Sequence, residues 1–263
     1  MKEIDKTKLK TNKIGRQICY YDEIDSTNLE AKKHQHDPSG HGMVFLAEQQ
    51  NQGRGRLGRN WVSPKETGIW MSILLKPAFA PELASQITLP TALATVEAIR
   101  EVTNLDCQIK WPNDIVVNGK KICGILTEMG TEGTSIGYLV VGIGINVNTE
   151  YFPEEIQDVA SSLKIEGRQA YSREDIIVEL LNRMEYYYEE FVKDGNLRRL
   201  VKTYNSLLIN KGKKVKIVGN ASTETGEALG IDDTGRLLVR MEDGEERAIV
   251  SGEVSVRGLY GYV

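Results

Sequence analysis

The chain has 263 residues, of which 40% are hydrophobic and 27% are charged, and its formal net charge is −4 at pH 7. This composition predicts a globular protein with one large domain, or with a main domain and a small appendage. The acidic balance argues against a general nucleic-acid-binding protein, for which a basic surface would be expected. The N-terminus has no apolar signal core and no segment approaches the ~20 apolar residues of a membrane span, so we expect a cytoplasmic protein without a membrane partner.

The cysteines and histidines do not form a recognisable metal or disulfide pattern. Cys19, Cys107 and Cys123 are an odd number without a CxxC pair, which indicates neither a disulfide framework nor a zinc site. The three histidines all lie between residues 34 and 41, where a metal site and a polar, solvated loop are the alternatives. We favour the polar loop.

The first half of the chain begins with a lysine-rich stretch over residues 1–15 that lacks apolar periodicity and is expected to be a frayed lead-in. Short apolar runs at 43–47 and 69–75 predict strands. Apolar residues then recur at three- and four-residue spacing from 89 to 99, which predicts an amphipathic helix.

Two apolar runs, 108–117 and 121–129, flank the dipeptide Asn118–Gly119 and are predicted to form a hairpin of two strands. The nearly continuous apolar run at 138–148 predicts a central strand that is buried on both faces. Two glycines within it leave room for the strand to line a pocket closely.

A longer helix is predicted to begin after Ser172, with Asp175 as its capping-box partner, and to end at Gly195. After about residue 208, short β-like pieces separated by turn residues predict a small β-barrel. The predicted divisions are a lead-in over 1–15, a main domain over 16–209 and a β-rich domain over 210–263.

The segment GRGRLGR, residues 53–59, places three arginines between glycines and is predicted to be a mobile loop. Backbone N–H groups of such a loop can form a concave anion site, and arginine side chains bind phosphate or carboxylate oxygens. The segment is neither a Walker A loop nor a dinucleotide fingerprint. A solvated basic loop is the alternative.

Two further motifs point to a polar or charged ligand. In KWPNDIVVNGKKICGIL (110–126), a lysine at a strand end can contact a phosphate and a nearby aspartate can help to hold magnesium. We favour Lys121 as the inward-pointing lysine because it begins an apolar strand, whereas Lys120 belongs to the turn. DSTN (25–28) is either a helix N-cap or a set of small polar groups that fix a ligand head group.

These three motifs and VGIGINVN (141–148), in this order, resemble the catalytic domain of the biotin protein ligases. ALGIDDTGRLLV (228–239) and VSGEVSVRG (250–258) are similar to the small C-terminal barrel of that family, so the resemblance extends from about residue 16 through nearly the whole chain. It implies an α+β fold, in which a mixed β-sheet with flanking helices, of the class II aminoacyl-tRNA synthetase-like (biotin–lipoate ligase) type, is followed by an SH3-like β-barrel.

The resemblance also implies a reaction. The family joins biotin to ATP with release of pyrophosphate, holds biotinyl-5′-AMP, and transfers biotin to one lysine of a biotin carboxyl carrier protein domain. ATP and biotin would thus be substrates, with Mg²⁺ as the accompanying ion. A carboxylate that attacks the α-phosphate brings two anions together, so fixed positive charge is required, and Arg54, Arg56 and Lys121 can supply it.

Site residues are carried over by their position in the motifs. Lys121 and Arg56 would be catalytic, and the arginine loop would close as a lid that keeps water from the adenylate. The residues implied for biotin are Ser26, Thr27, Asn28, Gln50, Gly53, Arg54, Gly55, Arg56, Lys121, Gly124, Gly142 and Gly144. The residues implied for ATP are Arg56, Arg59, Trp61, Asn113 and Asn146, with Asp114 for magnesium and with Trp61 packing on either biotin or adenine.

Some members of the family carry an N-terminal winged helix-turn-helix, whereas about fifteen residues precede the resemblance here. We therefore expect ligase activity alone, without a DNA partner, and a homodimer remains open. The alternatives are a lipoate or octanoate protein ligase, which would not be expected to carry this arginine loop, and a non-enzymatic biotin-sensing or nucleic-acid-binding module.

Overall fold

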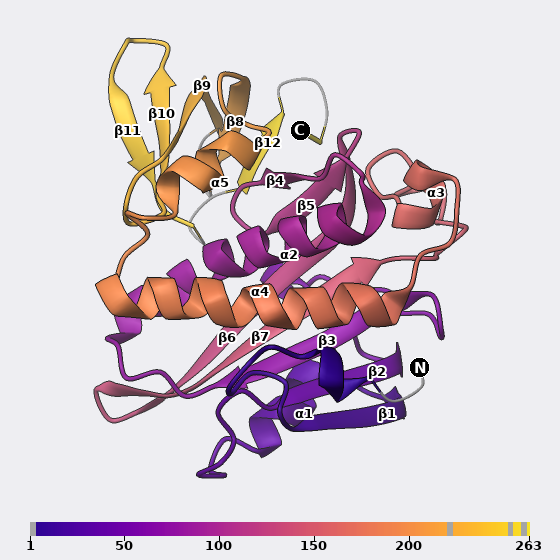
Figure 1. Cartoon of the computed structure of the whole chain (residues 1–263). Coiled ribbons are helices and arrows are strands. Elements are labelled where there is room, and N and C mark those ends of the chain that lie inside the picture. Colours follow the sequence, from indigo (N-terminus) through magenta and orange to yellow (C-terminus); the bar gives the residue numbers. More distant parts are fainter. Residues whose placement is uncertain (1–3, 220–222, 252–254, 259–261) are drawn as a thin grey trace.

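The computed structural model describes residues 4–219, 223–251, 255–258 and 262–263. A seven-stranded mixed sheet forms the larger part of the molecule (Figure 1). Its strands β1 and β2 are parallel, and all other neighbours are antiparallel. They are β1 (Ile18–Ile24), β2 (Val44–Gln50), β3 (Gly68–Leu75), β4 (Gln108–Lys110), β5 (Asp114–Val117), β6 (Lys120–Glu132) and β7 (Ser135–Asn146), in the spatial order β1-β2-β3-β7-β6-β5-β4.

Helices cover the two faces of this sheet unequally. The long helices α2 (Thr88–Thr103) and α4 (Arg173–Asp194) pack against each other and cover one face, and the short helix α1 (Thr27–Lys33) packs against β2, β3 and β7 (Figure 1). Side chains alternate between faces along a strand. On β7, Val141 belongs to the core under α2 and α4, whereas Val140 packs with Ala31 of α1. The two glycines at 142 and 144 therefore open toward the α1 face.

Two predicted elements with strong local signals are confirmed. Helix α4 begins after Ser172, whose hydroxyl accepts a hydrogen bond from the Asp175 N–H at 3.1 Å, and it ends at Gly195 with φ 62°. The turn between β5 and β6 is at Asn118 and Gly119, with φ of 50° and 78°, as expected for a two-residue hairpin turn. The predicted strands at 43–47 and 69–75, the helix at 89–99 and the central strand at 138–148 correspond to β2, β3, α2 and β7.

The prediction of one strand over 108–117 is wrong. The chain reverses at residues 111–113, so that β4 and β5 pair antiparallel with Lys110 opposite Asp114. Pro112 lies at this reversal and has no N–H to donate to a ladder, which is the physical reason for the break.

The prediction of a frayed lead-in is wrong for residues 4–14. Ile4, Leu9 and Ile14 are buried in the main core, and a single turn of 3-10 helix, η1 (Lys6–Lys8), lies between the first two. The carboxylate of Glu185 on α4 accepts hydrogen bonds from the backbone N–H groups of residues 12–14. The buried residues follow neither helical nor strand spacing, so the segment carries no periodic signal.

The remaining short elements of the first part are η2 (Arg56–Gly58), η3 (Pro81–Ile87) and α3 (Leu163–Gly167). After α5 (Val201–Leu207), a second, five-stranded antiparallel sheet follows. It contains β8 (Lys214–Val218), β9 (Thr223–Ile231), β10 (Leu237–Met241), β11 (Glu246–Ile249) and β12 (Ser255–Gly258), in the order β11-β10-β9-β8-β12.

The second sheet is joined to the first part by buried contacts. The indole N–H of Trp111 donates to the carbonyl of Gly235 at 3.0 Å, and the backbone N–H of Trp111 donates to Asn210 Oδ1 at 3.0 Å. One hydrophobic core extends from Ile109 through Leu208 to Leu237. In the part of the chain that the structure describes, none of the helices has the length and apolar character needed to cross a membrane.

Candidate active site

A pocket lies on the face of the mixed sheet that carries α1. Its wall includes Gly124 of β6 and Gly142 and Gly144 of β7. A Cβ atom at Gly142 would lie 2.2 Å from Oδ1 of Asn28, and one at Gly144 would lie 2.5 Å from Nε1 of Trp61. Only glycine fits here, because both distances are far below van der Waals contact.

Most of the residues predicted from the motifs surround this one pocket. Those that line it are Ser26, Thr27, Asn28, Gln50, Arg54, Gly55, Arg56, Trp61, Asn113, Lys121, Gly124, Gly142 and Gly144. Those that do not are Gly53, Arg59, Asp114 and Asn146. The lining also includes Met71, Ile125, Leu126 and Ile143, which the motifs missed. Their signal is the strand register, in which Leu126 and Gly142 are opposite each other.

One end of the pocket is a network of neutral hydrogen-bonding groups. Gln50 Oε1 accepts from the backbone N–H of Thr27 at 2.9 Å and from its hydroxyl at 3.1 Å. The hydroxyl of Ser72 lies 2.7 Å from Oγ1 of Thr27 and 2.6 Å from Oδ1 of Asn28. All three of Thr27, Asn28 and Ser72 are buried, so these groups are held in place without the competition of bulk water.

The network ends on a carboxylate that the motifs missed. Nδ2 of Asn28 donates to Glu128 at 2.7 Å, and Lys32 Nζ forms an ion pair with the same carboxylate at 2.6 Å. Burial would raise the pKa of Glu128, but the hydrogen bonds from Lys32 and Asn28 outweigh burial and hold this pKa below its ordinary value. Glu128 therefore stays charged near neutral pH and orients the Asn28 amide.

The DSTN segment combines the two readings that its sequence allowed. Ser26 occupies the N-cap position of α1, but its side chain makes no capping hydrogen bond and is only 2% exposed. Thr27 and Asn28 already belong to the helix and point into the network. The first turn of α1 therefore presents small polar side chains to the pocket.

Trp61 lies across the glycine wall. Its ring is the nearest neighbour of Gly144 and Gly124, and Nζ of Lys121 lies 5.1 Å from the ring centroid. Within the described residues, its buried indole N–H has no hydrogen-bond partner. A buried donor of this kind is costly unless it is paired, so this N–H can serve an acceptor in the pocket.

The other end of the pocket is charged. Nζ of Lys121 forms an ion pair with Oδ1 of Asp114 at 2.6 Å, and Nη1 of Arg56 donates to Oδ1 of Asn113 at 2.7 Å. Burial opposes ionisation of Asp114, but the ammonium groups of Lys121 and Lys110 outweigh burial and lower its pKa. By contrast, Nζ of Lys120 bonds the carbonyl of Gln157 at 3.0 Å, so Lys121 is the lysine that lines the pocket.

The assignment of Asp114 to magnesium does not fit this arrangement. Its oxygens are taken by the ammonium of Lys121 and the hydroxyl of Tyr262, and Asn113 Oδ1 accepts from Arg56. In the described part of the chain, no group of three or more His, Cys, Asp or Glu side chains is placed to hold a metal ion. Mg²⁺ prefers free carboxylate oxygens together with substrate phosphates.

The remaining predicted residues lie around the pocket rather than in its lining. The carbonyl of Gly53 accepts from the N–H of Trp61 at 2.9 Å, and a Cβ at Gly53 would lie 2.2 Å from the Trp61 carbonyl oxygen. Asn146 is buried and donates to the carbonyl of Ser161 at 3.1 Å. Arg59 is exposed. Gly53 and Asn146 therefore shape the pocket through the backbone.

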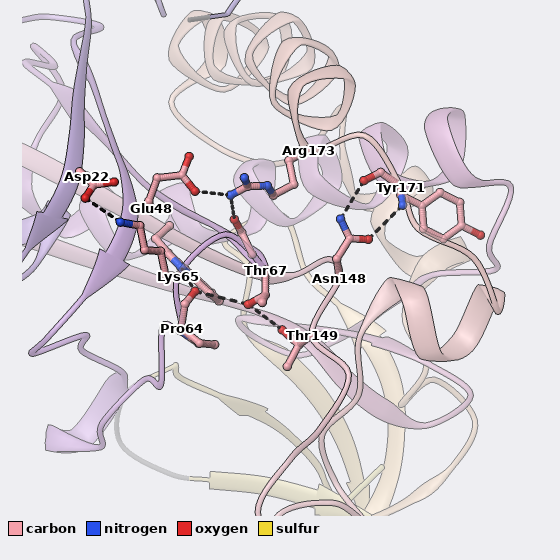
Figure 2. Close-up of polar contacts among 11 residues, drawn as sticks. Asp22, Glu48, Pro64, Lys65, Thr67, Asn148, Thr149, Tyr171 and Arg173 are labelled. Carbon is pink, nitrogen blue, oxygen red and sulfur yellow. Dashed lines mark hydrogen bonds and ion pairs between the residues drawn. The ribbon is translucent and has the colours of Figure 1, made fainter. Parts of the chain in front are cut away.

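The arginine loop is held at its ends and open at its tip. On its C-terminal side, Lys65 forms an ion pair with Asp22 at 2.7 Å, and the hydroxyl of Thr67 donates to the Pro64 carbonyl at 3.4 Å (Figure 2). At the tip, Leu57 is 73% exposed with φ of 56°. Arg56, next to Leu57, is held by its hydrogen bond to Asn113.

A second set of contacts in Figure 2 fixes the sheet beneath this loop. Arg173, at the start of α4, pairs with the buried Glu48 at 2.8 Å and donates to the carbonyl of Gly68 at 3.2 Å. Asn148 and the backbone of Tyr171 exchange two hydrogen bonds of 3.0 Å each. These contacts hold together the strands and the start of α4 that flank the base of the loop.

Comparisons with known proteins agree with this geometry. Residues 20–146 match the model of the biotin/lipoate A/B protein ligase family, and residues 212–257 match the biotin protein ligase C-terminal domain. The chain is 35% identical over 250 residues to the bifunctional ligase/repressor BirA of Bacillus subtilis, covering 94% of this chain and 76% of that protein. It is 30% identical to the biotin–[acetyl-CoA-carboxylase] ligase of Mycobacterium tuberculosis, covering 81% of this chain and 78% of that protein.

Among solved structures, the biotin protein ligase of Aquifex aeolicus in complex with biotin and ATP matches with a TM-score of 0.80 and 32% identity. The match covers 92% of this chain and 99% of that chain. Sequence relatives and structural match agree over both sheets, and the chain therefore belongs to the biotin protein ligases of the biotin/lipoate A/B protein ligase family.

Proposed function

We propose that the chain activates biotin with ATP to form biotinyl-5′-AMP and pyrophosphate, and then transfers biotin to one lysine of a biotin carboxyl carrier protein domain. The observation that carries this proposal is a single pocket with two different ends. A neutral hydrogen-bonding network lies at one end and a cluster of cationic side chains lies at the other. Biotin has the matching shape, with a polar ureido ring and a carboxylate separated by an apolar chain.

The neutral end suits the ureido head. A ring urea has one acceptor and two donors, and Ser26, Thr27 and Asn28 supply hydroxyl and amide groups of both kinds. The glycine wall lets the bicyclic ring approach the backbone of β6 and β7 closely. We assign this end to biotin recognition.

The cationic end suits the first chemical step. A carboxylate oxygen of biotin attacks the α-phosphorus of ATP, the new bond is the mixed anhydride, and the bond to the leaving pyrophosphate breaks. The two reacting groups are both anionic, so the step needs preorganised positive charge where they meet. Lys121 and Arg56 line the pocket at this end and are proposed to supply it.

In the second step, the amine of the carrier lysine attacks the acyl carbon and AMP leaves with the electron pair of the broken bond. The adenylate must survive until the carrier arrives, which requires the exclusion of water. We assign this task to the loop around GRGRLGR, with Arg54 and Arg56 over biotin and its activated carboxyl group and Arg59 toward the nucleotide. Trp61 would close the pocket beneath the same loop.

Finer features of the sequence-based expectation are part of this proposal. The five-stranded sheet would complete an SH3-like barrel, the mixed sheet would be of the class II synthetase-like type, and the domains would meet near Asn210. Mg²⁺ would enter with the phosphates of ATP rather than as a ligand of Asp114. A cytoplasmic location, a homodimer and the lack of a DNA partner remain expectations from the sequence.

The test is the choice of acid. Purified protein should catalyse ATP–pyrophosphate exchange with biotin and should transfer labelled biotin to a carrier domain. Lipoate is the control, since a lipoate or octanoate ligase is the main alternative within the family. Exchange with lipoate but not with biotin would refute the proposal.

A further inference from the structure

Tyr262, the penultimate residue of the sequence, contacts Asp114, which is the ion-pair partner of the pocket-lining Lys121. Its hydroxyl donates a short hydrogen bond to Oδ2 of Asp114, and its ring lies under Nζ of Lys110, 4.1 Å from the centroid. Val263 abuts Gly119, where a Cβ would lie 3.2 Å from its side chain. Gly258 lies so close to the Val263 carbonyl that a Cβ would be 1.9 Å away. Tyr262 and Val263 are therefore closely packed against β5, Gly119 and Gly258.

Asp114 lies between two ammonium groups that compete for one carboxylate. Lys110 is its partner in the β4–β5 register, and Lys121 reaches it from β6. Lys121 Nζ forms an ion pair with Oδ1 of Asp114 at 2.6 Å, and the hydroxyl of Tyr262 donates to Oδ2 of Asp114. Within the part of the chain that the structure describes, Lys110 has no ion pair within 4.0 Å and contacts the face of the Tyr262 ring instead.

The unpaired state of Lys110 is unusual for a charged group in this position. Lys110 is only 6% exposed, and burial, opposed by Asp114, lowers its pKa to about 8. The neighbouring cations Lys121, Arg257 and Arg56 contribute to this lowering. One carboxylate against these cations leaves a local excess of positive charge, which an oligophosphate would neutralise.

We propose that Tyr262 is a positioning residue: by occupying Oδ2 of Asp114, it restricts this carboxylate to Lys121 and leaves the Lys110 ammonium available to the phosphates of ATP. The inference rests on the proposed function, because it assumes that ATP binds at the charged end. Without the phenol hydroxyl, Lys110 pairs with the vacated Oδ2, and ATP must break that ion pair in order to bind. Biotin, at the other end of the pocket, is unaffected.

The direct test is Tyr262→Phe, which keeps the ring under Lys110 and removes only the hydroxyl. We expect the Kd for ATP, measured by calorimetry, to rise about tenfold, the equivalent of one hydrogen bond to a charged group. The Kd for biotin should stay within twofold of the wild-type value. Tyr151→Phe, at a tyrosine that is 86% exposed, is the matched control and should change neither value.

A double-mutant cycle tests the mechanism rather than the contact. In a Lys110→Met background there is no second ammonium to capture Oδ2, so Tyr262→Phe should then have no further effect on ATP affinity. An unchanged ATP affinity in Tyr262→Phe, an equal loss for ATP and biotin, or additive effects in the cycle would each overturn the inference. Since the readout is binding, a wild-type protein that binds ATP but fails to transfer biotin would refute the proposed function and not this one.

Discussion

Replacing Gly142 with alanine tests the glycine wall and the hydrogen-bonding network together. The new methyl group would lie 2.2 Å from Oδ1 of Asn28, so the amide must move by ~1 Å or more to reach van der Waals contact. Asn28 would then lose its 2.6 Å contact with Ser72 and weaken its 2.7 Å bond to Glu128. A neutral hydrogen bond contributes ~1 kcal/mol and one to a charged group ~1.5–3 kcal/mol, so the expected loss of unfolding free energy is about 2–4 kcal/mol.

Chemical denaturation measures this loss, and calorimetry with biotin and ATP measures its effect on the pocket. The Kd for biotin should rise at least ~tenfold, because the polar groups at the neutral end are displaced, while the Kd for ATP should stay near the wild-type value. Gly137→Ala, on the same strand, is the control, since its methyl group would meet only the exposed side chain of Glu132, at 2.9 Å. Normal stability and normal biotin affinity in Gly142→Ala would refute this account of the wall.

Three further predictions follow from the site and its supports. Lys121→Ala should slow adenylate formation by about two to three orders of magnitude, since one preorganised charge is worth ~3–4 kcal/mol. The control is Lys120→Ala, which should not slow the reaction because the Lys120 side chain bonds the carbonyl of Gln157. Equal rates for the two variants would contradict the role of Lys121. Arg56→Gly should release free biotinyl-5′-AMP that labels lysines indiscriminately, and unchanged carrier selectivity in a mass-spectrometric survey would count against the lid. Burial opposes ionisation of Glu185, but the N–H groups of residues 12–14 outweigh burial and lower the pKa of this carboxyl group. The charged carboxylate therefore stabilises the fold fully above pH ~4.3, and this stabilisation is lost as the pH falls through the folded-state pKa. Glu185→Gln should therefore lower the Tm at pH 7, and the difference from the wild type should shrink below pH 4; a constant difference would argue against the charged clamp.

Local signals predicted the elements whose determinants lie within a few residues. The cap of α4 depends on Ser172 and Asp175, which are three residues apart, and the β5–β6 turn depends on two adjacent residues. Both are readable from sequence because the interaction closes within one turn of chain. The break of 108–117 into two strands also has a local signal, Pro112, which the prediction of a single strand did not use. The lead-in depends on α4, whose Glu185 accepts hydrogen bonds from its backbone, and this contact leaves no periodic pattern in the lead-in.

The site shows the same division. Residue types and spacing in DSTN, GRGRLGR and KKICGIL offered a polar head-group site, an anion loop and an inward lysine beside a helix cap, a solvated loop and an exposed turn lysine, and the family resemblance selected among these interpretations. They did not indicate Glu128, which lies one hundred residues from Asn28 along the chain. The sheet register decides which side chains share a face, and register is a property of paired strands rather than of either strand alone.

The sequence by itself determined the chemistry available to this protein: the small polar groups, the arginines between glycines and the lysine at the start of a strand. Only the tertiary structure decided which charged side chains lie in contact with one another. Asp114 and Tyr262 are 148 residues apart, yet a hydrogen bond joins them beside Lys121 and Lys110. The physical reason is that a buried charge takes its state from whichever groups the fold brings within a few ångströms, and sequence distance does not record that proximity.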